Sequence, residues 1–434
     1  AFPPSRARLA GLPVAIDAAA ARIKLLTPAS MQARLESRLQ LLTGGARDLP
    51  TRQQTLRGAI DWSYDLLSAG EQRLFRRLSV FVSGCTLEAV EAVCNTKGDM
   101  ELDGLDGMAS LVDQSLLQRV ERGAGESRFV RLDTIREYGL ERLVASEEEA
   151  ATRRAHAAYC LVLAEEGAAS GATAMQAEWL DLFEMEHDNL GAAMDWLIQT
   201  GNAEWGLRLG AALFRYWESR EHFAEGRDRL AKVLKLEAGT VSTLPRARVL
   251  FAAGALAGAQ GDYVSACLLF RENLEIAREL KDNWGVAVSL NALAITTRDR
   301  GGIAESRSLF EESLALWREL GDRTAVARAL SNLASVVNLQ GDHALARSLD
   351  EECLSIFKGL GDATGMAWSL THQGDASRSH GDPAGACALA EKGRPMFLEL
   401  GDRWAMSHTP VDLGRRIRAR GDSATSAAPQ HRAP

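Results

Sequence analysis

The sequence lacks the segments that place a chain in a membrane or send it out of the cell. It has no apolar run of the about 18 to 20 residues needed to cross a bilayer. Its N-terminus shows no basic flank followed by an apolar stretch and a small-residue cleavage site. The six cysteines are scattered without the spacing of a disulfide framework or a zinc site. We therefore expect a cytoplasmic protein without membrane contact, whose cysteines are reduced thiols of the core.

The sequence also lacks the residues of a nucleotide phosphate loop and of a metal site. Such a loop needs Gly-x-x-x-x-Gly-Lys followed by Ser or Thr, because backbone amides and the Lys ammonium hold the phosphates. No Gly-Lys dipeptide occurs in the chain. None of its histidines forms a His-x-x-x-His pair or lies near cysteine at zinc spacing. We expect no catalytic residue, no metal and no cofactor in this chain, so that it is not an enzyme by itself.

What the sequence does have is a repeat of about forty residues in its C-terminal half. Gly followed by Asp, or a close relative, recurs at Gly261-Asp262, Gly301-Gly302, Gly341-Asp342, Gly381-Asp382 and Gly421-Asp422. A second series, offset by about twenty residues, is Lys281-Asp282, Gly321-Asp322, Gly361-Asp362 and Gly401-Asp402. Gly after a helical run supplies a left-handed C-cap, and the following Asp accepts the first free amides of another helix. The two series predict two helices in each repeat.

Small residues recur at a fixed phase of these helices, where two helices must approach closely. They are Gly254, Ala294, Ala334 and Gly374 in the first helix and Ala266, Ser306, Ala346 and Ala386 in the second. The pattern resembles the tetratricopeptide repeat, whose usual period is about 34 residues. It predicts a predominantly all-α fold, with a tetratricopeptide-like α-solenoid over residues 201–420 and a disordered tail over 421–434.

Residues 51–150 do not share the repeat and predict a domain of their own, since 434 residues are too many for one core. Helical patterns at about 55–67, 69–81 and 86–94 precede two strand-like runs at 115–120 and 128–132. The Gly-rich stretch 121–127 between these runs indicates a hairpin. Three helices and a hairpin predict a winged-helix domain. Its 12 Lys and Arg against 18 Asp and Glu argue against DNA binding, because DNA readers present a basic face.

Five stretches in the same order resemble one family, the bacterial signal-transduction ATPases with numerous domains (STAND), which carry an NB-ARC nucleotide module. The stretches are Gly11-Leu12-Pro13 within residues 9–26, residues 49–67, residues 71–81, Arg136-Glu137-Tyr138, and Glu186-His187-Asp188-Asn189-Leu190. The resemblance implies that residues 1–50 are a helical remnant of the module. It further implies that the winged helix is an internal brace, and that residues 151–200 are a helical linker opening the repeats.

The same resemblance implies ADP or ATP in the intact protein, and self-assembly through an upstream module. Pro13 would lie near the adenine, with Gly11 and Leu12 as the turn that sets it, only when joined to that module. A second family contact, the His of a Met-His-Asp motif, falls on Arg131-Leu132-Asp133, where Leu132 cannot hydrogen-bond a phosphate. Because the chain begins at Ala1 and stops in mid-repeat, we expect a fragment of a longer protein.

The first helices of stacked repeats line an inner groove that suits a protein or peptide partner. Counting from the small residues predicts the side chains of this inner face. They are Arg248, Asn291, Arg298, Arg328, Ser331, Ser335, Asn338, Thr371, Asp375 and Arg378. Arg and Asn reach carboxylates and peptide backbone. A solvated polar face without a partner remains the other interpretation of this set.

Three further features receive structural interpretations. We expect His187 to pack or cap a helix, Glu147-Glu148-Glu149 to be a solvated helix end or linker, and Trp179, Trp196, Trp205 and Trp217 to form a core layer. The sequence thus predicts the sensor and protein-interaction part of a STAND-type regulator. A stand-alone repeat scaffold without a nucleotide switch and a DNA-binding winged-helix regulator remain as alternatives.

Overall fold

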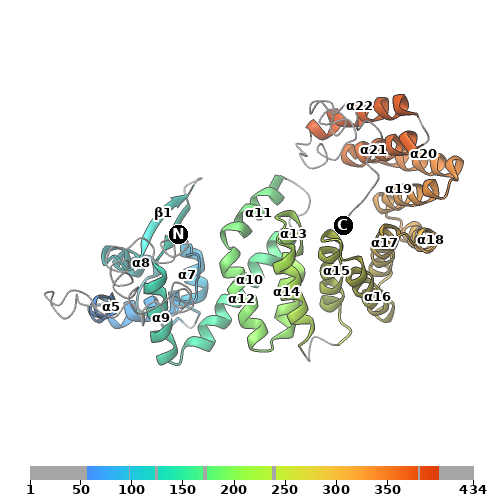
Figure 1. Cartoon of the computed structure of the whole chain (residues 1–434). Helices are drawn as coiled ribbons and strands as arrows, with labels where there is room; N and C mark the ends of the chain where they lie inside the picture. Colours follow the sequence, from blue (N-terminus) through green and yellow to red (C-terminus); the bar gives the residue numbers. More distant parts are fainter. Residues whose placement is uncertain are drawn as a thin grey trace, which may run out of the picture. The chain divides into compact units, whose positions relative to one another are not determined.

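The structure is a computed structural model that describes residues 56–96, 98–122, 126–169, 174–236, 241–379 and 382–399. The predictions for residues 1–50, including Gly11, Leu12 and Pro13, and for the tail lie outside these ranges. The chain forms two compact units that divide between His222 and Phe223, blue to green and green to red in Figure 1. No helix within the described ranges is long and apolar enough to span a bilayer.

The winged-helix domain occupies the start of the first unit. Its helices are α5 (Leu56–Asp65), α6 (Ala69–Leu78), α7 (Leu87–Cys94), α8 (Gly104–Asp113) and α9 (Asp133–Ala145). Strands β1 (Gln118–Arg122) and β2 (Glu126–Val130) pair antiparallel, and Cys85 adds one bridge to Phe129. Ser68 opens α6 with a capping box, in which its amide donates to Glu71 Oε2 at 2.6 Å. The predicted helices and hairpin are therefore confirmed.

The strands begin and end at other residues than the sequence predicts. Ser115 adopts a left-handed φ of 58°, which closes α8. The amides of Leu116 and Leu117 then both donate to the Leu111 carbonyl, at 2.9 and 3.2 Å. These residues belong to the end of the helix, so the predicted strand 115–120 moves to 118–122. Its partner moves from 128–132 to 126–130 because α9 already begins at Asp133.

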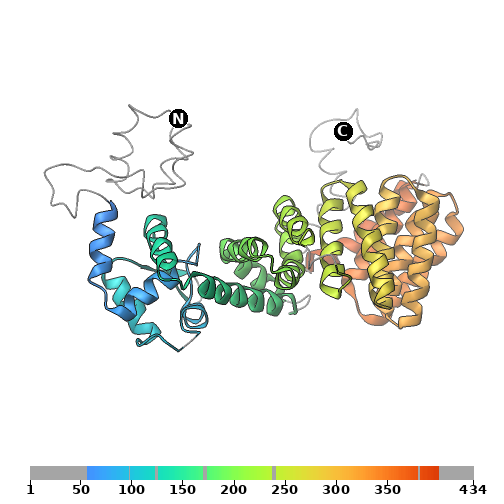
Figure 2. The same ribbon diagram turned by 90° about the horizontal axis from the view of Figure 1, so that it is seen from below.

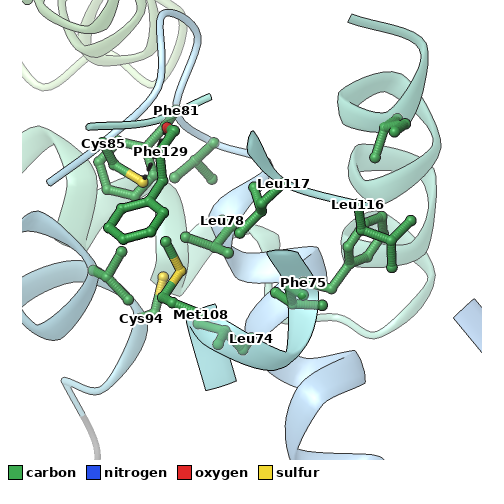
Figure 3. Close-up of a cluster of buried hydrophobic side chains, with 14 of the residues drawn as sticks. Leu74, Phe75, Leu78, Phe81, Cys85, Cys94, Met108, Leu116, Leu117 and Phe129 are labelled. Atoms are coloured by element: carbon green, nitrogen blue, oxygen red, sulfur yellow. Dashed lines mark hydrogen bonds between the residues drawn. The ribbon is translucent and has the colours of Figure 1, made fainter. Parts of the chain in front are cut away.

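The core of the domain gathers apolar side chains from its five helices and the hairpin. Figure 3 shows Leu74, Phe75 and Leu78 of α6 with Met108 of α8 and Phe129 of β2. Phe75 also belongs to an aromatic trio with Tyr64 and Tyr138, whose ring centroids lie 5.5 to 6.3 Å apart. This trio fixes α5 and α9 on α6.

Four more helices complete the first unit. They are α10 (Glu149–Ala169), α11 (Ala174–Met185), α12 (His187–Gln199) and α13 (Ala203–Ser219). Helix α10 contacts α12 and α13 on one side and α7 of the winged helix on another. Of the four tryptophans expected in a core layer, Trp217 is buried, whereas Trp179, Trp196 and Trp205 are half-buried.

The second unit is the repeat solenoid. Its helices are α14 (Phe223–Leu234), α15 (Leu244–Ala259), α16 (Tyr263–Glu279), α17 (Asn283–Asp299), α18 (Ile303–Leu320), α19 (Arg323–Leu339), α20 (His343–Leu360), α21 (Ala363–Ser379) and α22 (Pro383–Glu399). From α15 onward, each first helix packs against the second helix of its own repeat, and the yellow to orange helices stand side by side in Figure 2. The predominantly helical fold with a tetratricopeptide-like solenoid is thereby confirmed.

The forty-residue series acts as predicted at the helix ends. Gly261, Gly301 and Gly341 have left-handed φ values of 78°, 90° and 88°. Asp262 and Asp342 cap the next helix by accepting backbone amides at 3.2 Å. At the intermediate turns, Gly321 and Gly361 end α18 and α20 in the same left-handed conformation, and Asp322 caps α19.

Ion pairs join the second helices of successive repeats. Arg271 meets Glu305 at 3.2 Å, Arg278 meets Glu312 at 2.9 Å, and Arg318 meets Glu352 at 2.9 Å. All six side chains are about half exposed, so each pair contributes little free energy. We call these three pairs the ion-pair ladder.

Candidate functional site

The first helices of three repeats enclose a groove, which we call the repeat groove. Its volume is about 350 Å³. The lining residues are Asn291 of α17, Arg328, Ser331 and Asn332 of α19, Phe357 of α20, and Thr364, Gly365, Trp368 and Ser369 of α21. Three of the predicted inner-face residues, Asn291, Arg328 and Ser331, therefore come together here.

The groove presents a cation beside hydrogen-bonding amides. Arg328 is exposed and forms no ion pair with any described residue. The Asn332 amide donates to Asn291 Oδ1 at 3.1 Å, which links two neighbouring repeats. Each amide keeps further donor and acceptor positions, and Trp368 supplies an aromatic wall. This combination matches the carboxylates, peptide groups and apolar side chains of a polypeptide.

The other predicted inner-face residues lie elsewhere. Arg248 is exposed on α15, Ser335 is half-buried, and Arg298 pairs with Asp299 at 2.8 Å. Thr371 is buried and donates to the Ala367 carbonyl at 3.0 Å, because α21 turns this face toward its neighbours. Asn338 lines a different pocket, and the side chains of Asp375 and Arg378 are outside the described part of the structure.

The counting rule missed six of the nine groove residues, and Trp368 and Asn332 are the two of them that carry the polar and aromatic chemistry of the site. Trp368 lies forty residues after Arg328, and it therefore occupies the same phase of its helix. Extending the series that already held Arg248 and Arg328 by one more repeat finds it. Asn332 follows Ser331 directly. Nothing in the sequence indicates that its side chain lines the groove while other polar side chains of the helix do not.

The DNA-reading face of the winged helix carries acidic and apolar side chains. Helix α8 holds the position of a recognition helix, and it contains Asp106 and Asp113 but no Lys or Arg. Asp103 caps its first turn, and Leu105 is 56% exposed. Phosphate contact requires cations at such a surface. Helix α8 itself supplies none of these cations.

A buried polar network ties the wing to the helices that follow. Arg128 of β2 points inward and pairs with Glu186, and their side chains are 8% and 6% exposed. Arg128 also donates to the carbonyls of Ser83 and Gly84 at 3.2 and 3.1 Å. Asn189 accepts from the Val82 amide at 2.7 Å and donates to Glu186 Oε2 at 2.6 Å. We call Arg128, Glu186 and Asn189 the wing brace.

The wing brace explains the structural role of residues 186–190, which the sequence identified only by their resemblance to a family. In Glu186-His187-Asp188-Asn189-Leu190, the first and fourth residues contact the winged helix. His187 has the packing role expected for it, since its Nδ1 lies 2.9 Å from the Tyr216 hydroxyl. Nearby, burial lowers the pKa of His156 to about 4, so this ring is neutral where it packs edge-on to Phe81.

The acidic run before α10 is more than a solvated helix end. Glu148 accepts from Arg76 at 2.9 Å and from Arg77 at 3.3 Å, and its side chain is 21% exposed. Arg77 also donates to Asp99 and thereby lowers the pKa of Asp99 to about 2. The expectation for this run is wrong at Glu148, because two arginines on α6 draw its carboxylate back to the domain.

The position that resembles a phosphate-sensing motif does not fit a phosphate. Leu132 is the N-cap of α9 and makes no side-chain hydrogen bond there. Asp133 is the exposed first residue of the helix rather than its cap. Arg131 directs its guanidinium to the carbonyls of Leu78 and Phe81, and burial lowers its pKa to about 10.

Within the part of the chain that the structure describes, most thiols are buried and the metal-binding side chains do not cluster. Among the described residues, no group of three His, Cys, Asp or Glu side chains is placed to hold a metal ion. Five cysteines are buried as expected, and burial raises the pKa of Cys85 to about 12, which keeps that thiol protonated. Cys387 is exposed, so the expectation of a core thiol is wrong there because this position of α22 faces solvent.

Comparison with known proteins matches both domains. Residues 245–319, 285–359 and 325–399 match the tetratricopeptide repeat family, and residues 67–144 match the winged helix-turn-helix domain family. A Mycobacterium tuberculosis protein named as an HTH-type transcriptional regulator is 38% identical over 249 residues, or 56% of this chain and 28% of that protein. An uncharacterised protein of the same organism is 38% identical over 142 residues, or 32% of this chain and 36% of that protein. This chain spans well under half the length of these curated relatives.

A solved structure of a STAND protein with a tetratricopeptide repeat sensor, from Pyrococcus horikoshii, aligns with a TM-score of 0.45 and 14% identity. The alignment covers 94% of this chain and 66% of that chain. By fold and by family match, this chain carries a winged helix-turn-helix domain followed by tetratricopeptide repeats.

Proposed function

We propose that this chain is the sensing part of a longer, cytoplasmic STAND-type regulator, in which the repeats bind a protein or peptide. The observation that carries the proposal is the repeat groove, where Arg328, the Asn291 and Asn332 amides and Trp368 line one cavity. Tetratricopeptide repeats serve protein interaction, and an exposed arginine without an acidic partner is suited to a carboxylate of the bound chain. The chain itself acts by binding and not by catalysis.

In this proposal the winged helix is a connecting element. Arg128 is paired with Glu186 in the wing brace, and α8 carries carboxylates at the surface where a DNA-binding domain carries cations. The domain would transmit the state of the repeats to a nucleotide module outside this chain. The intact protein would bind ADP or ATP there and self-assemble through that module.

A panel of selected peptides tests the groove. Peptides from a random displayed library are selected on the wild-type chain, and their Kd values are then measured for Arg328→Ala. We expect at least tenfold weaker binding, since one charge-assisted contact is worth about 1.5 to 3 kcal/mol. Arg318→Ala is the matched control, because Arg318 belongs to the ion-pair ladder and not to the groove. Failure to select any peptide, or equal binding by both variants, would contradict the proposal.

A DNA-binding regulator is the second candidate, and the name of the Mycobacterium tuberculosis relative favours it. Fluorescence anisotropy with a labelled nonspecific duplex separates the two. Nonspecific DNA binding by a competent domain gives a Kd of about 10⁻⁴ to 10⁻⁶ M at physiological salt, with strong salt dependence. We expect no binding in that range. Labelled ADP and ATP should also fail to bind, and a P-loop upstream in the reading frame would distinguish the regulator from a plain repeat scaffold.

A further inference from the structure

One repeat of the solenoid carries a carboxylate at a position of the core. Phe270 of α16 and Phe310 of α18 occupy this position in their repeats, and both are buried. Asp350 of α20 follows forty residues after Phe310 and is only 6% exposed. A charge in place of an aromatic ring opposes folding unless the charge finds a partner. Sequence rules that fail at a single position often mark a functional site.

The carboxyl group of Asp350 has no such partner within the described residues. Its Oδ1 atom is buried and meets no hydrogen-bond donor. Arg347 stands one helical turn earlier on α20, is exposed, and forms no ion pair with Asp350. Burial raises the pKa of Asp350 to about 7, and no neighbouring cation lowers it. The fold therefore holds a carboxyl group ready for a partner that it does not itself supply.

Asp350 lines a pocket of about 310 Å³, which we call the Asp350 pocket. The lining residues are Asn338 of α19, His343, Ala346, Arg347, Asp350 and Glu351 of α20, Gln373 and Ser377 of α21, Asp382, and Leu389 of α22. The smaller side chain of Asp350, where the two preceding repeats have a phenyl ring, leaves room here. None of these residues lines the repeat groove.

The pocket is rich in hydrogen-bond acceptors. Glu351 and Asp382 add two carboxylates to Asp350, against the single guanidinium of Arg347. Gln373 donates its amide nitrogen to the Asp350 carbonyl at 3.4 Å, which leaves its amide oxygen as an acceptor. Asp382 uses one oxygen to cap α22 through the Gly385 amide at 2.8 Å and keeps the other.

We propose that the Asp350 pocket is a second binding site of the solenoid, separate from the repeat groove, and that it takes a guanidinium or primary ammonium group. Such a cation supplies the donors that the buried carboxylate lacks, and a guanidinium pairs with a carboxylate through two parallel hydrogen bonds. Leu389 and Ala346 give an apolar wall for the methylene stem of the ligand. Both a small free amine and an arginine side chain of a peptide have this chemistry.

Isothermal titration calorimetry on the whole chain, with two probes, distinguishes these sources. One probe is agmatine, and the other is the blocked peptide acetyl-Gly-Arg-Gly-amide, with the Gln peptide of the same length as the uncharged comparison. Saturable binding of agmatine supports a free amine as ligand. Binding of the Arg peptide alone supports a peptide side chain. In both cases the Gln peptide should bind at least tenfold more weakly.

Two substitutions and two controls complete the test. Asp350→Asn removes the charge at nearly constant shape and should weaken binding at least tenfold. Asp350→Phe places the ring of the two preceding repeats at this position, so it should abolish binding while raising Tm, which shows that the loss is not misfolding. Glu352→Gln, on the exposed ladder side of the same helix, should bind as the wild type does.

Arg328→Ala should also leave probe binding unchanged, because Arg328 lies in the repeat groove. Failure to select peptides for the repeat groove would therefore not contradict the Asp350 pocket as a binding site. Failure of the cationic probes to bind would likewise not contradict peptide binding in the groove. The proposal is overturned if neither cationic probe binds saturably, or if Asp350→Asn binds a probe as tightly as the wild type.

Discussion

Breaking the wing brace is the sharpest test of the first unit, because the structure fixes what each partner loses. The Arg128 side chain is 8% exposed, and Glu186→Leu removes the one carboxylate that pairs with it among the described residues. Removing one member of a buried pair costs about 3 to 5 kcal/mol, since it leaves an uncompensated buried charge. Asn189 also loses its 2.6 Å acceptor, which places the expected cost in the upper half of that range.

The double variant Arg128→Met with Glu186→Leu provides a second test of the free energy expected for the wing brace. Replacing a whole buried pair by apolar side chains is often neutral. Here the carbonyls of Ser83 and Gly84 also lose the Arg128 donor, and each unsatisfied carbonyl costs about 1 kcal/mol or more. We therefore expect the double variant to lose about 2 kcal/mol, less than either single variant, so that the coupling energy is favourable by several kcal/mol.

The assay combines urea unfolding with hydrogen exchange of the segments around residues 82–86 and 126–130. Exchange is needed because a chain of two units does not guarantee two-state unfolding. Arg119→Ala is the control, since Arg119 lies on the neighbouring strand with its side chain 56% exposed and should change stability by less than about 0.5 kcal/mol. A cost below about 1 kcal/mol for Glu186→Leu, or a double variant worse than the sum of the singles, would refute the reasoning.

Three further perturbations give distinct outcomes. Between pH 4 and pH 8 the wild type should lose up to about 4 kcal/mol of stability relative to Asp350→Asn, because the unfolded carboxyl ionises near 3.8 and the folded one only near 7. The other ionisable groups of the pocket are the same in the wild type and in Asp350→Asn, namely His343, Arg347, Glu351 and Asp382. The difference between the urea midpoints of the two proteins therefore isolates Asp350, and a difference that does not change with pH would contradict this prediction. Gly139→Ala should lower stability by about 1 to 3 kcal/mol, because its Cβ would overlap Ser79 Oγ, whereas Gly104→Ala meets only Glu91 at 3.7 Å and should melt as the wild type does. Arg278→Ala should lower the free energy of unfolding by less than about 1 kcal/mol, measured by thermal unfolding, since its pair with Glu312 is half exposed. A larger loss would show that the ion-pair ladder stabilises the solenoid more than exposed pairs usually do.

The solenoid was predictable from sequence because its signals are local. A left-handed Gly and a capping Asp act within one turn of chain, so Gly341-Asp342 specifies a helix stop and restart without reference to the rest of the fold. The phase of the small residues is local in the same sense. This phase predicted the inner-face residues only in part. Arg328 and Asn291 line the groove as predicted, whereas Thr371 is buried.

Features that depend on distant partners were not predictable. Glu186 meets Arg128 of the wing, and Asn189 meets Gly84 before α7, each across more than fifty residues of chain. Nothing beside them in the sequence indicates these partners. Asp350 is visible as an exception only after the repeats are aligned and its burial is known. The register of β1 depended on the backbone of Ser115, whose left-handed conformation carries no composition signal.

The ion-pair ladder and the repeat groove use different helices of each repeat, and this separation bears on how such proteins diversify. Ladder residues stand on second helices, and most groove residues stand on first helices. A substitution at Arg328 or Trp368 therefore changes what the groove recognises while the joints between repeats stay as they are. New ligand preferences can arise one side chain at a time on an unchanged scaffold.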